Sequence, residues 1–386
     1  MPSFDKRLPS KVIRDHAKGA GRQRPVQYRD RDVDDYRKQV ENLLELAAQK
    51  GSSDLHLSTG YYATVRVDGR LMPLADLGIL DRQTVEGMAF SVMDDAHRER
   101  FLAGKEIDFA YELGQKLRCR TNIYLSRGNY AIVFRFIPEH IRTVEELNLP
   151  SSIKIFSKLS QGFVLVVGPN GHGKSTTMAA LVDLINHERA EKIITVEDPI
   201  EYIFTPDRSI IDQRELYLDT LSFDGALRST FRENVNVIMI GEMRDYETMA
   251  AAVSAAETGH LVLASLHTND AAQTVERIVN AFPPAQQAQI MIQLANTISG
   301  VVSQRLIPRL KGGLIPAAEV MIATSAVRNL IRENKPQQLN LVIETGAEAG
   351  MISLNRSLVD LVHRHEISIE QAEFYSPNPA ELKTLV

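Results

Sequence analysis

Residues Gly168 to Ser175 carry the clearest chemical signal in the chain. They read Gly-Pro-Asn-Gly-His-Gly-Lys-Ser and fit the pattern G-x-x-x-x-G-K-[ST] of a phosphate-binding loop, the Walker A motif. Glycines let backbone N–H groups curl around phosphates, Lys174 adds a positive charge, and the Ser175 hydroxyl can ligate Mg²⁺. A bland Gly-rich turn does not require Gly-Lys-Ser at this register. The motif predicts a site for ATP and Mg²⁺ formed by Gly168, Pro169, Asn170, Gly171, His172, Gly173, Lys174, Ser175 and Thr176.

Two groups of carboxylates follow the loop. Residues 197–201 hold three acids within five positions, which is costly unless a positive or catalytic partner uses them. A carboxylate can orient and partly deprotonate the water that attacks the γ-phosphate, and Glu197 and Glu201 are both candidates. The alternative is a charged, solvated loop. Farther on, the apolar run Val237 to Ile240 delivers Glu242, as in a Walker B segment, so Glu242 is predicted to hold Mg²⁺ or its water shell.

His260 and His267 flank a further apolar run. Histidines beside a strand are more often structural than catalytic. The competing interpretation is a sensor that contacts the γ-phosphate or a neighbouring subunit. Because no cysteine or third histidine lies at a suitable spacing, a zinc site is rejected.

Alternating strands and helices are expected to position these groups. Four continuous apolar runs, separated by helical stretches, predict buried parallel strands of an α/β sheet. Ligands bind beyond the carboxyl ends of such strands, which is where the motifs stand. The runs are Gly162 to Val167, Lys192 to Val196, Val237 to Ile240 and His260 to Ser265.

The region before the loop has a different pattern. Apolar residues at helical spacing predict an amphipathic helix from about residue 33 to Gly51. Short alternating segments then predict a small α+β domain. Those segments are Asp54 to Leu57, Thr64 to Val67 with a turn at Asp68-Gly69, Arg118 to Tyr124 and Ala131 to Ile137. The expected division is a basic extension at 1–33, an amino-terminal domain at 34–138, a linker at 139–152, and an ATPase domain with a carboxyl-terminal helical region at 153–386.

Composition narrows the class of protein. A chain of 386 residues is expected to form two domains, and 44% hydrophobic residues, 24% charged residues and a net charge of −5 do not suggest a nucleic-acid partner. The single cysteine, Cys119, excludes a disulfide framework and suits a reducing cytoplasm. No targeting segment or run long enough to span a bilayer is found, so a soluble cytoplasmic protein is expected. Residues 1–33 carry nine Lys or Arg against four Asp and predict a solvated arm, or one that docks on an acidic partner or anionic membrane.

Taken together, these motifs resemble the type IV pilus retraction ATPases, the PilT family of the secretion-ATPase superfamily. The resemblance spans about residues 36–376. Its parts are Ser53 to Leu57 with Arg66 to Gly69 in the amino-terminal domain, Glu197 to Tyr202 in the Asp box, Gly241 to Asp245 in the Walker B segment and Thr258 to Asn269 in the His box. Ala326 to Glu333 is similar to a carboxyl-terminal motif linked with retraction, and it also fits an ordinary amphipathic helix with Val327, Leu330 and Ile331 inward.

The resemblance implies a RecA-like P-loop ATPase core with a smaller amino-terminal α+β domain that is PAS-like. It implies a homohexamer with nucleotide between the two domains, in which Glu201 activates water and Glu242 is the Walker B glutamate. Arginines of the first domain, among Arg118, Arg120, Arg127 and Arg135, are expected to reach the phosphates, although strand-surface arginines are usually only solvated.

The same resemblance implies a motor for pilus retraction. Its expected partners are an inner-membrane platform protein and other pilus ATPases, and its expected place is the cytoplasmic face of the inner membrane. Asn170 and His172 stand where the family commonly has Thr and Ser, and residues 234–236 replace a usual Asp-Pro-Asp, so turnover is expected to be slow.

Four other functions compete with this interpretation. A pilus-assembly or type II secretion ATPase shares the core, but such proteins are usually longer and often carry a four-cysteine zinc element. An accessory retraction ATPase is disfavoured by the carboxyl-terminal motif, and a non-hydrolysing nucleotide sensor by the intact Lys174, Glu201 and Glu242. A helicase is disfavoured by the acidic balance and the absence of a basic and aromatic groove pattern.

Overall fold

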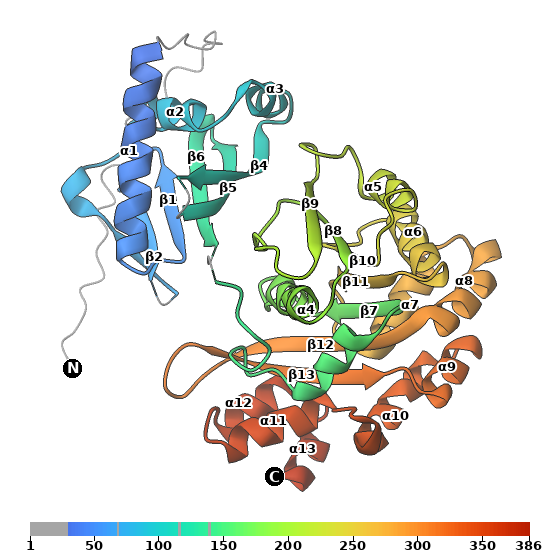
Figure 1. Cartoon of the computed structure of the whole chain (residues 1–386). Coiled ribbons are helices and arrows are strands. Elements are labelled where there is room, and N and C mark those ends of the chain that lie inside the picture. The colour runs from blue at the N-terminus through green and yellow to red at the C-terminus, as the bar shows by residue number, and fades with distance from the viewer. Residues whose placement is uncertain (1–29, 68, 115–116, 138–139) are drawn as a thin grey trace.

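Two β-sheets organise the protein in the computed structural model. The structure describes residues 30–67, 69–114, 117–137 and 140–386. Most of the basic segment 1–33 therefore lies outside the described residues, as do Asp68 of the predicted turn and Pro138 of the predicted boundary. Figure 1 shows one sheet in each of two units, which we call the amino-terminal unit (residues 30–137) and the carboxyl-terminal unit (residues 151–386). The predicted domain boundaries stay a prediction.

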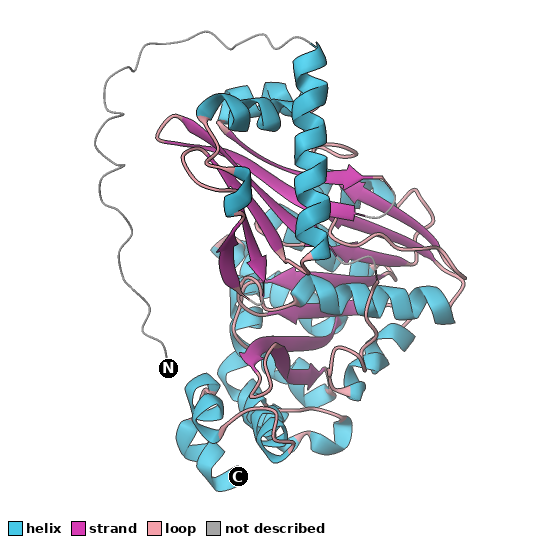
Figure 2. Cartoon of the chain, turned by 90° about the vertical axis from the view of Figure 1, so that its left-hand side faces the viewer, coloured by secondary structure: helices cyan, strands magenta, loops and turns pink. Residues whose placement is uncertain are grey.

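The amino-terminal unit is a six-stranded antiparallel sheet with helices on one face. Its order is β3-β2-β1-β6-β5-β4. The elements are α1 (Asp30–Gln49), β1 (Asp54–Ser58), β2 (Thr64–Val67), β3 (Arg70–Pro73), η1 (Ala75–Leu77), α2 (Arg82–Ser91), α3 (Asp95–Gly104), β4 (Glu106–Leu113), β5 (Leu117–Ser126) and β6 (Asn129–Ile137). Figure 2 shows α1 crossing in front of this sheet. Strands β1, β2, β5 and β6 correspond to the segments predicted from the sequence, whereas β3 and β4 were not predicted.

Alternation along the strands gives this sheet two different faces. Leu55, Ile123 and Phe134 are fully buried in the core beneath α1 and α2. Their neighbours Arg120 and Arg135 stand opposite each other in the β5–β6 register, on the other face. That polar face is turned toward the carboxyl-terminal unit (Figure 1).

The carboxyl-terminal unit is a seven-stranded sheet with helices on both faces, an α/β arrangement. Its order is β13-β12-β7-β11-β10-β8-β9. The elements are η2 (Ser151–Lys158), β7 (Gly162–Val167), α4 (Lys174–Glu188), β8 (Lys192–Glu197), β9 (Ile210–Glu215), α5 (Phe223–Thr230), β10 (Val237–Ile240), α6 (Tyr246–Glu257), β11 (Leu261–Leu266), α7 (Ala271–Ala281), α8 (Pro284–Thr297), β12 (Ile298–Pro308) and β13 (Leu314–Ile322). The four predicted strands are β7, β8, β10 and β11. The sheet is mixed, because β13 pairs with β12 in the antiparallel sense.

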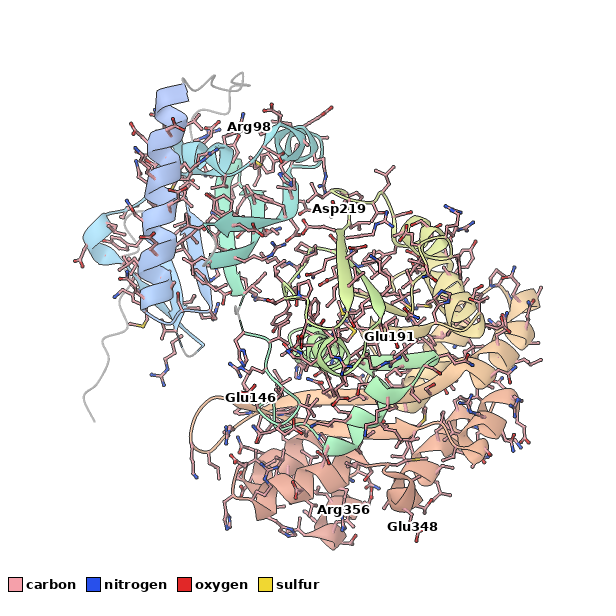
Figure 3. All side chains as sticks on the ribbon, viewed as in Figure 1. Arg98, Glu146, Glu191, Asp219, Glu348 and Arg356 are labelled. Carbon is pink, nitrogen blue, oxygen red and sulfur yellow. The ribbon has the colours of Figure 1, made fainter. Side chains whose placement is uncertain are left out.

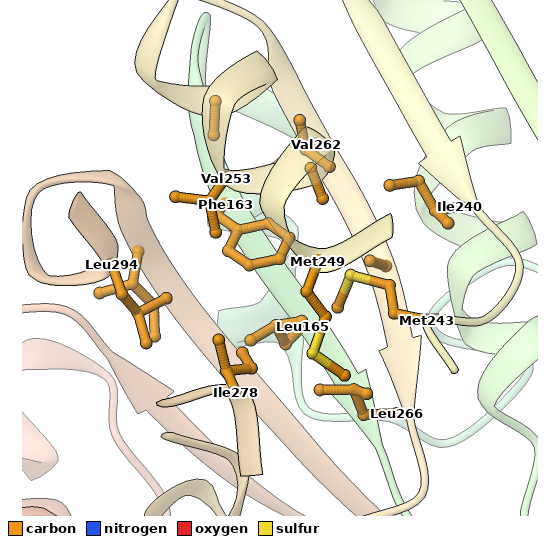
Figure 4. Close-up of a cluster of buried hydrophobic side chains, with 14 of the residues drawn as sticks. Phe163, Leu165, Ile240, Met243, Met249, Val253, Val262, Leu266, Ile278 and Leu294 are labelled. Carbon is orange, nitrogen blue, oxygen red and sulfur yellow. The ribbon is translucent and has the colours of Figure 1, made fainter. Parts of the chain in front are cut away.

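Burial on both faces explains the continuous apolar strands. Leu165 of β7 packs under α6, α7 and α8, whereas its neighbours Val164 and Val166 face α4. Figure 4 shows the first of these two cores, with Phe163, Leu165, Met249, Val253, Ile278 and Leu294 among its side chains. The strand that leads into the phosphate-binding motif is thereby held on both sides.

A carboxyl-terminal set of helices follows the sheet. It comprises α9 (Ser325–Arg332), η3 (Pro336–Gln338), α10 (Leu339–Thr345), η4 (Ala347–Ala349), α11 (Leu354–His363), α12 (Ile369–Tyr375) and α13 (Pro379–Leu385). Within α9, Val327 and Ile331 are fully buried and Leu330 is partly buried, as the helical spacing predicted. Arg328 donates to the carbonyl oxygens of Ala295 and Asn296, both at 2.7 Å. These bonds satisfy two carbonyl groups in the last turn of α8 that lack partners within the helix.

The two units touch through side chains at the edge of α3. The guanidinium of Arg100 lies over the ring of Tyr217, 4.5 Å from its centroid. Figure 3 shows Asp219, in the same loop after β9, on the side of the carboxyl-terminal unit that faces α3. Within the described part of the chain, none of the helices is both long and apolar enough to cross a bilayer.

Candidate active site

The phosphate-binding motif forms the turn between β7 and α4. All six residues of β7 are buried, and α4 begins at Lys174 directly after Gly173. Gly168, Gly171 and Gly173 have positive φ values of 148°, 76° and 83°. A Cβ on Gly168 would lie 2.5 Å from the carbonyl oxygen of Gln304, so only glycine fits there. The loop therefore curls tightly around the N-terminus of α4, the arrangement that binds phosphate.

Lys174 is buried inside this loop. Its Nζ donates to the carbonyl oxygens of Gly168 and Pro169, both at 3.0 Å, and to Nδ1 of His267 at 3.1 Å. Burial lowers the pKa of Lys174, while the negative charges of Glu242 and Glu201 oppose that effect. Because lysine only donates, Nδ1 of His267 is the acceptor, and Nε2 carries the proton.

His267 links the lysine to Glu242. Its Nε2 lies 3.0 Å from Oε1 of Glu242, at the carboxyl end of β10. Arg244 donates to the other oxygen of Glu242 at 3.1 Å and reaches Asp198 at 3.4 Å. Burial acts to raise the pKa of Glu242, but the hydrogen bonds from Arg244 and His267 and the charge of Arg244 outweigh it, so the pKa is lowered and the carboxylate stays charged.

Geometry separates the two candidate bases. Glu197 is buried and accepts hydrogen bonds from Thr195 Oγ1 at 2.7 Å and from the backbone N–H of Glu201 at 3.3 Å. Burial raises the pKa of Glu197 to about 7. Glu201 instead is half-buried, and its Oε1 lies 3.5 Å from Nη1 of Arg120 in the other unit. Glu197 is thus placed to hold the loop after β8 through hydrogen bonds, whereas Glu201 is placed to face a ligand.

Two neighbouring cavities flank the phosphate-binding loop. One has a volume of about 260 Å³ and the other about 280 Å³. Both are lined by Arg120, Asn170, Lys174, Ser175 and Glu201. The first also includes Glu197, Asp198, Glu242, Arg244 and His267, and the second includes Arg135, Phe136, Ile137, Thr176 and Tyr202. The site therefore lies between the two units, and its charged groups come from both.

Two of the four candidate arginines reach these cavities. Arg120 lies between Asp108 at 3.6 Å and Glu201 at 3.5 Å. Arg135 also lines a cavity, and its Nε donates to Asp54 at 3.0 Å.

The other two arginines are not brought to the site. Arg118 pairs with Glu112 and lies 3.7 Å from the buried Glu215, so its charge is used in ion pairs outside the cavities. The expectation that Arg118 binds the cofactor stays a prediction. Arg127 sits in the turn between β5 and β6, at the opposite end of the hairpin from Arg118 and Ile137.

His260 is also absent from the site. It precedes β11 at the amino-terminal end of the strand, whereas His267 follows the carboxyl-terminal end. Its ring nitrogen lies 2.9 Å from the carbonyl oxygen of Ala255, and the ring meets Phe231 edge-on. Contact of His260 with a γ-phosphate bound in its own chain is therefore wrong, because a strand of this length spans roughly 20 Å. Contact with a neighbouring subunit stays a prediction.

Sequence reasoning missed two groups at this site. Arg244 has no predicted role in the Walker B segment, although it pairs with both Glu242 and Asp198. The only sequence signal was its position two residues after Glu242. Tyr202 was likewise unassigned, and its hydroxyl lies 2.9 Å from Oγ1 of Thr176 at the start of α4.

Known proteins share this fold and these motifs. Residues 30–314 match the family described as type II/IV secretion system protein. The type IV pilus retraction ATPase PilT of Pseudomonas aeruginosa is 42% identical over 333 residues, which are 86% of this chain and 96% of that protein. The type IV pilus ATPase PilU of the same organism is 37% identical over 349 residues, 90% of this chain and 91% of that protein.

A solved structure agrees with these relatives. The crystal structure of the pilus retraction motor PilT with bound ADP superimposes with a TM-score of 0.82 at 41% identity, over 89% of this chain and 99% of that one. The α/β fold and the phosphate-binding loop thus define an ATPase of the secretion class. The chain belongs to the PilT family of type IV pilus retraction ATPases. The predicted family and ATPase fold class are confirmed, while the PAS-like nature of the amino-terminal unit stays a prediction.

Replacing Glu197 with glutamine is expected to remove part of the pH dependence of stability. The folded carboxyl keeps its proton to about pH 7, whereas an unfolded chain loses it near 4.5. Wild-type stability should therefore fall as pH rises from about 4.5 to 7, by up to about 3 kcal/mol. Urea unfolding at pH 5 and pH 8 should show this loss in the wild type and in Glu276→Gln, an exposed control on α7, but less of it in Glu197→Gln. Equal losses in all three proteins would contradict the buried, protonated state of Glu197.

Proposed function

We propose that this protein is a hexameric motor that hydrolyses ATP to ADP and phosphate in the presence of Mg²⁺ and so drives retraction of type IV pili. One observation carries the proposal: Lys174, Glu201, Glu242 and Arg120 converge on adjoining cavities around the turn between β7 and α4. Membership in the PilT family supports the direction of the motor.

The phosphate chain of ATP is proposed to bind in the loop Gly168 to Ser175. Backbone N–H groups at the start of α4 donate to the phosphate oxygens, and Lys174 exchanges its carbonyl contacts for the β- and γ-phosphates. The ligand set fits Mg²⁺, because the Ser175 hydroxyl and the Glu242 carboxylate line one cavity and Mg²⁺ with ATP needs few protein oxygens. When bound, the ion would neutralise phosphate charge.

Hydrolysis is then proposed to use Glu201 as the base. Its carboxylate orients a water molecule and takes its proton while the water oxygen bonds to the γ-phosphorus and the bond to the bridging oxygen of ADP breaks. Lys174 and Arg120 stabilise the negative charge of the transferred group, and Arg135 stands beside Arg120 at the same cavity. His267 keeps Lys174 and Glu242 aligned from the end of β11.

Hydrolysis becomes motion because the site spans both units. Arg120 belongs to β5, whereas Glu201 and the phosphate loop belong to the carboxyl-terminal unit. Phosphate release removes a charge shared by the two units and allows one to rotate against the other. In a homohexamer at the cytoplasmic face of the inner membrane, this rotation would push on a platform protein so that pilin subunits leave the pilus base. Other pilus ATPases are proposed as further partners.

A second candidate is an accessory retraction ATPase that works beside a main motor. This candidate is supported because Pseudomonas aeruginosa has a second type IV pilus ATPase, PilU, beside PilT, and the similarity to PilU extends over 90% of this chain. The nucleotide chemistry would be the same, so only the effect on pili separates the two functions.

Glu201→Gln is expected to reduce kcat for ATP hydrolysis by about 100- to 10,000-fold while ADP binding is retained, because the amide cannot accept a proton. Phosphate release assays with the purified hexamer, with Mg²⁺ and with excess EDTA, measure this effect. Glu276→Gln removes an exposed carboxylate on α7 and should match the wild type. Unchanged turnover in Glu201→Gln, or turnover that survives EDTA, would show that the proposed site or its metal requirement is wrong.

Deletion of the gene is expected to leave cells with excess surface pili and no twitching motility, because assembly continues without retraction. Pili are counted by electron microscopy in the deleted strain restored with wild type or with Lys174→Ala, which removes the charge that holds the phosphates. Only the wild type should restore motility. Cells without surface pili would show that the protein is an assembly ATPase. An unchanged number of pili would favour the accessory function.

A further inference from the structure

Strand β12 forms a wall behind the phosphate-binding loop. Gln304 of β12 is fully buried, and its Nε2 donates to the carbonyl oxygen of His172 at 2.6 Å. Its Oε1 accepts from Oγ1 of Thr177, in the first turn of α4, at 2.7 Å. One amide thus ties the loop to the helix that follows it.

The side chain of His172 makes the second attachment. Strands β7 and β12 pair until Val167 stands beside Ser303, and beyond that point β7 turns away into the loop. The backbone N–H of Leu306, farther along β12, donates instead to Nδ1 of His172 at 2.9 Å. The imidazole therefore satisfies a backbone donor on β12 beyond the point where β7 leaves the ladder.

We propose that His172 and Gln304 are positioning residues that attach the phosphate-binding loop to strand β12 and hold it in the conformation that binds phosphate. This inference rests on the proposed function, since it concerns the same nucleotide site. Neither residue needs to touch the nucleotide. They act by keeping backbone N–H groups and Lys174 in place before ATP arrives, which lowers the ordering cost of binding.

The attachment requires a neutral imidazole, because a protonated ring has no acceptor for the Leu306 N–H. Burial and then the positive charges of Arg305, on β12, and Lys174, at the start of α4, lower the pKa of His172. The ring is therefore neutral near pH 7 and gains a proton only at acidic pH. Nucleotide affinity should fall in that range.

Binding of the fluorescent nucleotide mant-ADP to the full-length protein tests this role. His172→Leu removes the acceptor and is expected to weaken binding about tenfold at pH 7.5, the loss of roughly one buried hydrogen bond. His172→Asn offers a side-chain oxygen near the position of Nδ1 and should stay within about twofold of the wild type. His363→Leu, an exposed histidine at the end of α11, is the matched control and should bind as the wild type does.

The pH dependence of binding is a second test, because a side chain with only a structural role would not make nucleotide affinity depend on its protonation. As the pH falls from 7.5 through the lowered pKa of His172, the wild type should lose affinity relative to His172→Asn, whose side chain does not titrate. Because both proteins meet the same ligand, protonation of the nucleotide phosphate cancels in their ratio. A ratio that stays constant down to the lowest pH at which both proteins remain folded would overturn the inference.

Other outcomes also decide the question. Equal binding by the wild type and His172→Leu overturns the positioning role and leaves the proposed function intact. Failure of the wild type itself to bind contradicts the proposed function and the inference with it. If His172→Leu does not fold, Thr177→Val removes only the bond to Gln304 at nearly constant volume, and it should bind about threefold more weakly. Unchanged binding by that variant would overturn the role of Gln304.

Discussion

Repulsion between like charges is the constraint on which the rest of this site depends. The carboxyl ends of β8 and β10 and the loop after β8 bring Glu197, Asp198, Glu201 and Glu242 to one cavity, where a triphosphate is to bind as well. The protein meets this constraint in two ways. Glu197 is kept protonated to about pH 7 by burial, Arg120 pairs with Glu201, and Arg244 pairs with Asp198 and Glu242. Glu242 also accepts a hydrogen bond from Nε2 of His267.

The same electrostatic demand explains why the amino-terminal unit is part of the site. Its sheet hides apolar side chains beneath α1 and α2 and turns a polar face toward the carboxyl-terminal unit. Arg120 projects from that face to Glu201, so the charge balance at the phosphate loop depends on how the two units are placed. Under the proposed function, a nucleotide that changes this balance also changes the preferred placement of the two units, which is the coupling that a motor needs.

Elements with a strong local sequence pattern were predicted correctly. Predictions failed for residues whose role depends on contacts between distant parts of the chain. Four buried strands were predicted from continuous apolar runs, and the phosphate-binding loop was predicted from its glycines, Lys174 and Ser175. Strand β9 was missed because it is a partly exposed edge strand, and β12 because it follows α8 without a turn signal. His260 and His267 flank one strand, and the strand's direction already puts only His267 at the carboxyl end, but the sequence could not show which groups each ring contacts. Arg118 and Arg120 alternate with buried residues in the same way, and only the partners Glu112 and Glu201 separate them.

The most direct test of a site shared by both units is the rate of ATP hydrolysis by Arg120→Ala compared with Arg127→Ala. Both variants remove one arginine from the same hairpin, but only Arg120 faces Glu201 and the phosphate loop. The account predicts that kcat falls at least about 100-fold in Arg120→Ala and stays at the wild-type value in Arg127→Ala. Wild-type turnover in both variants would contradict it and confine the chemistry to the carboxyl-terminal unit.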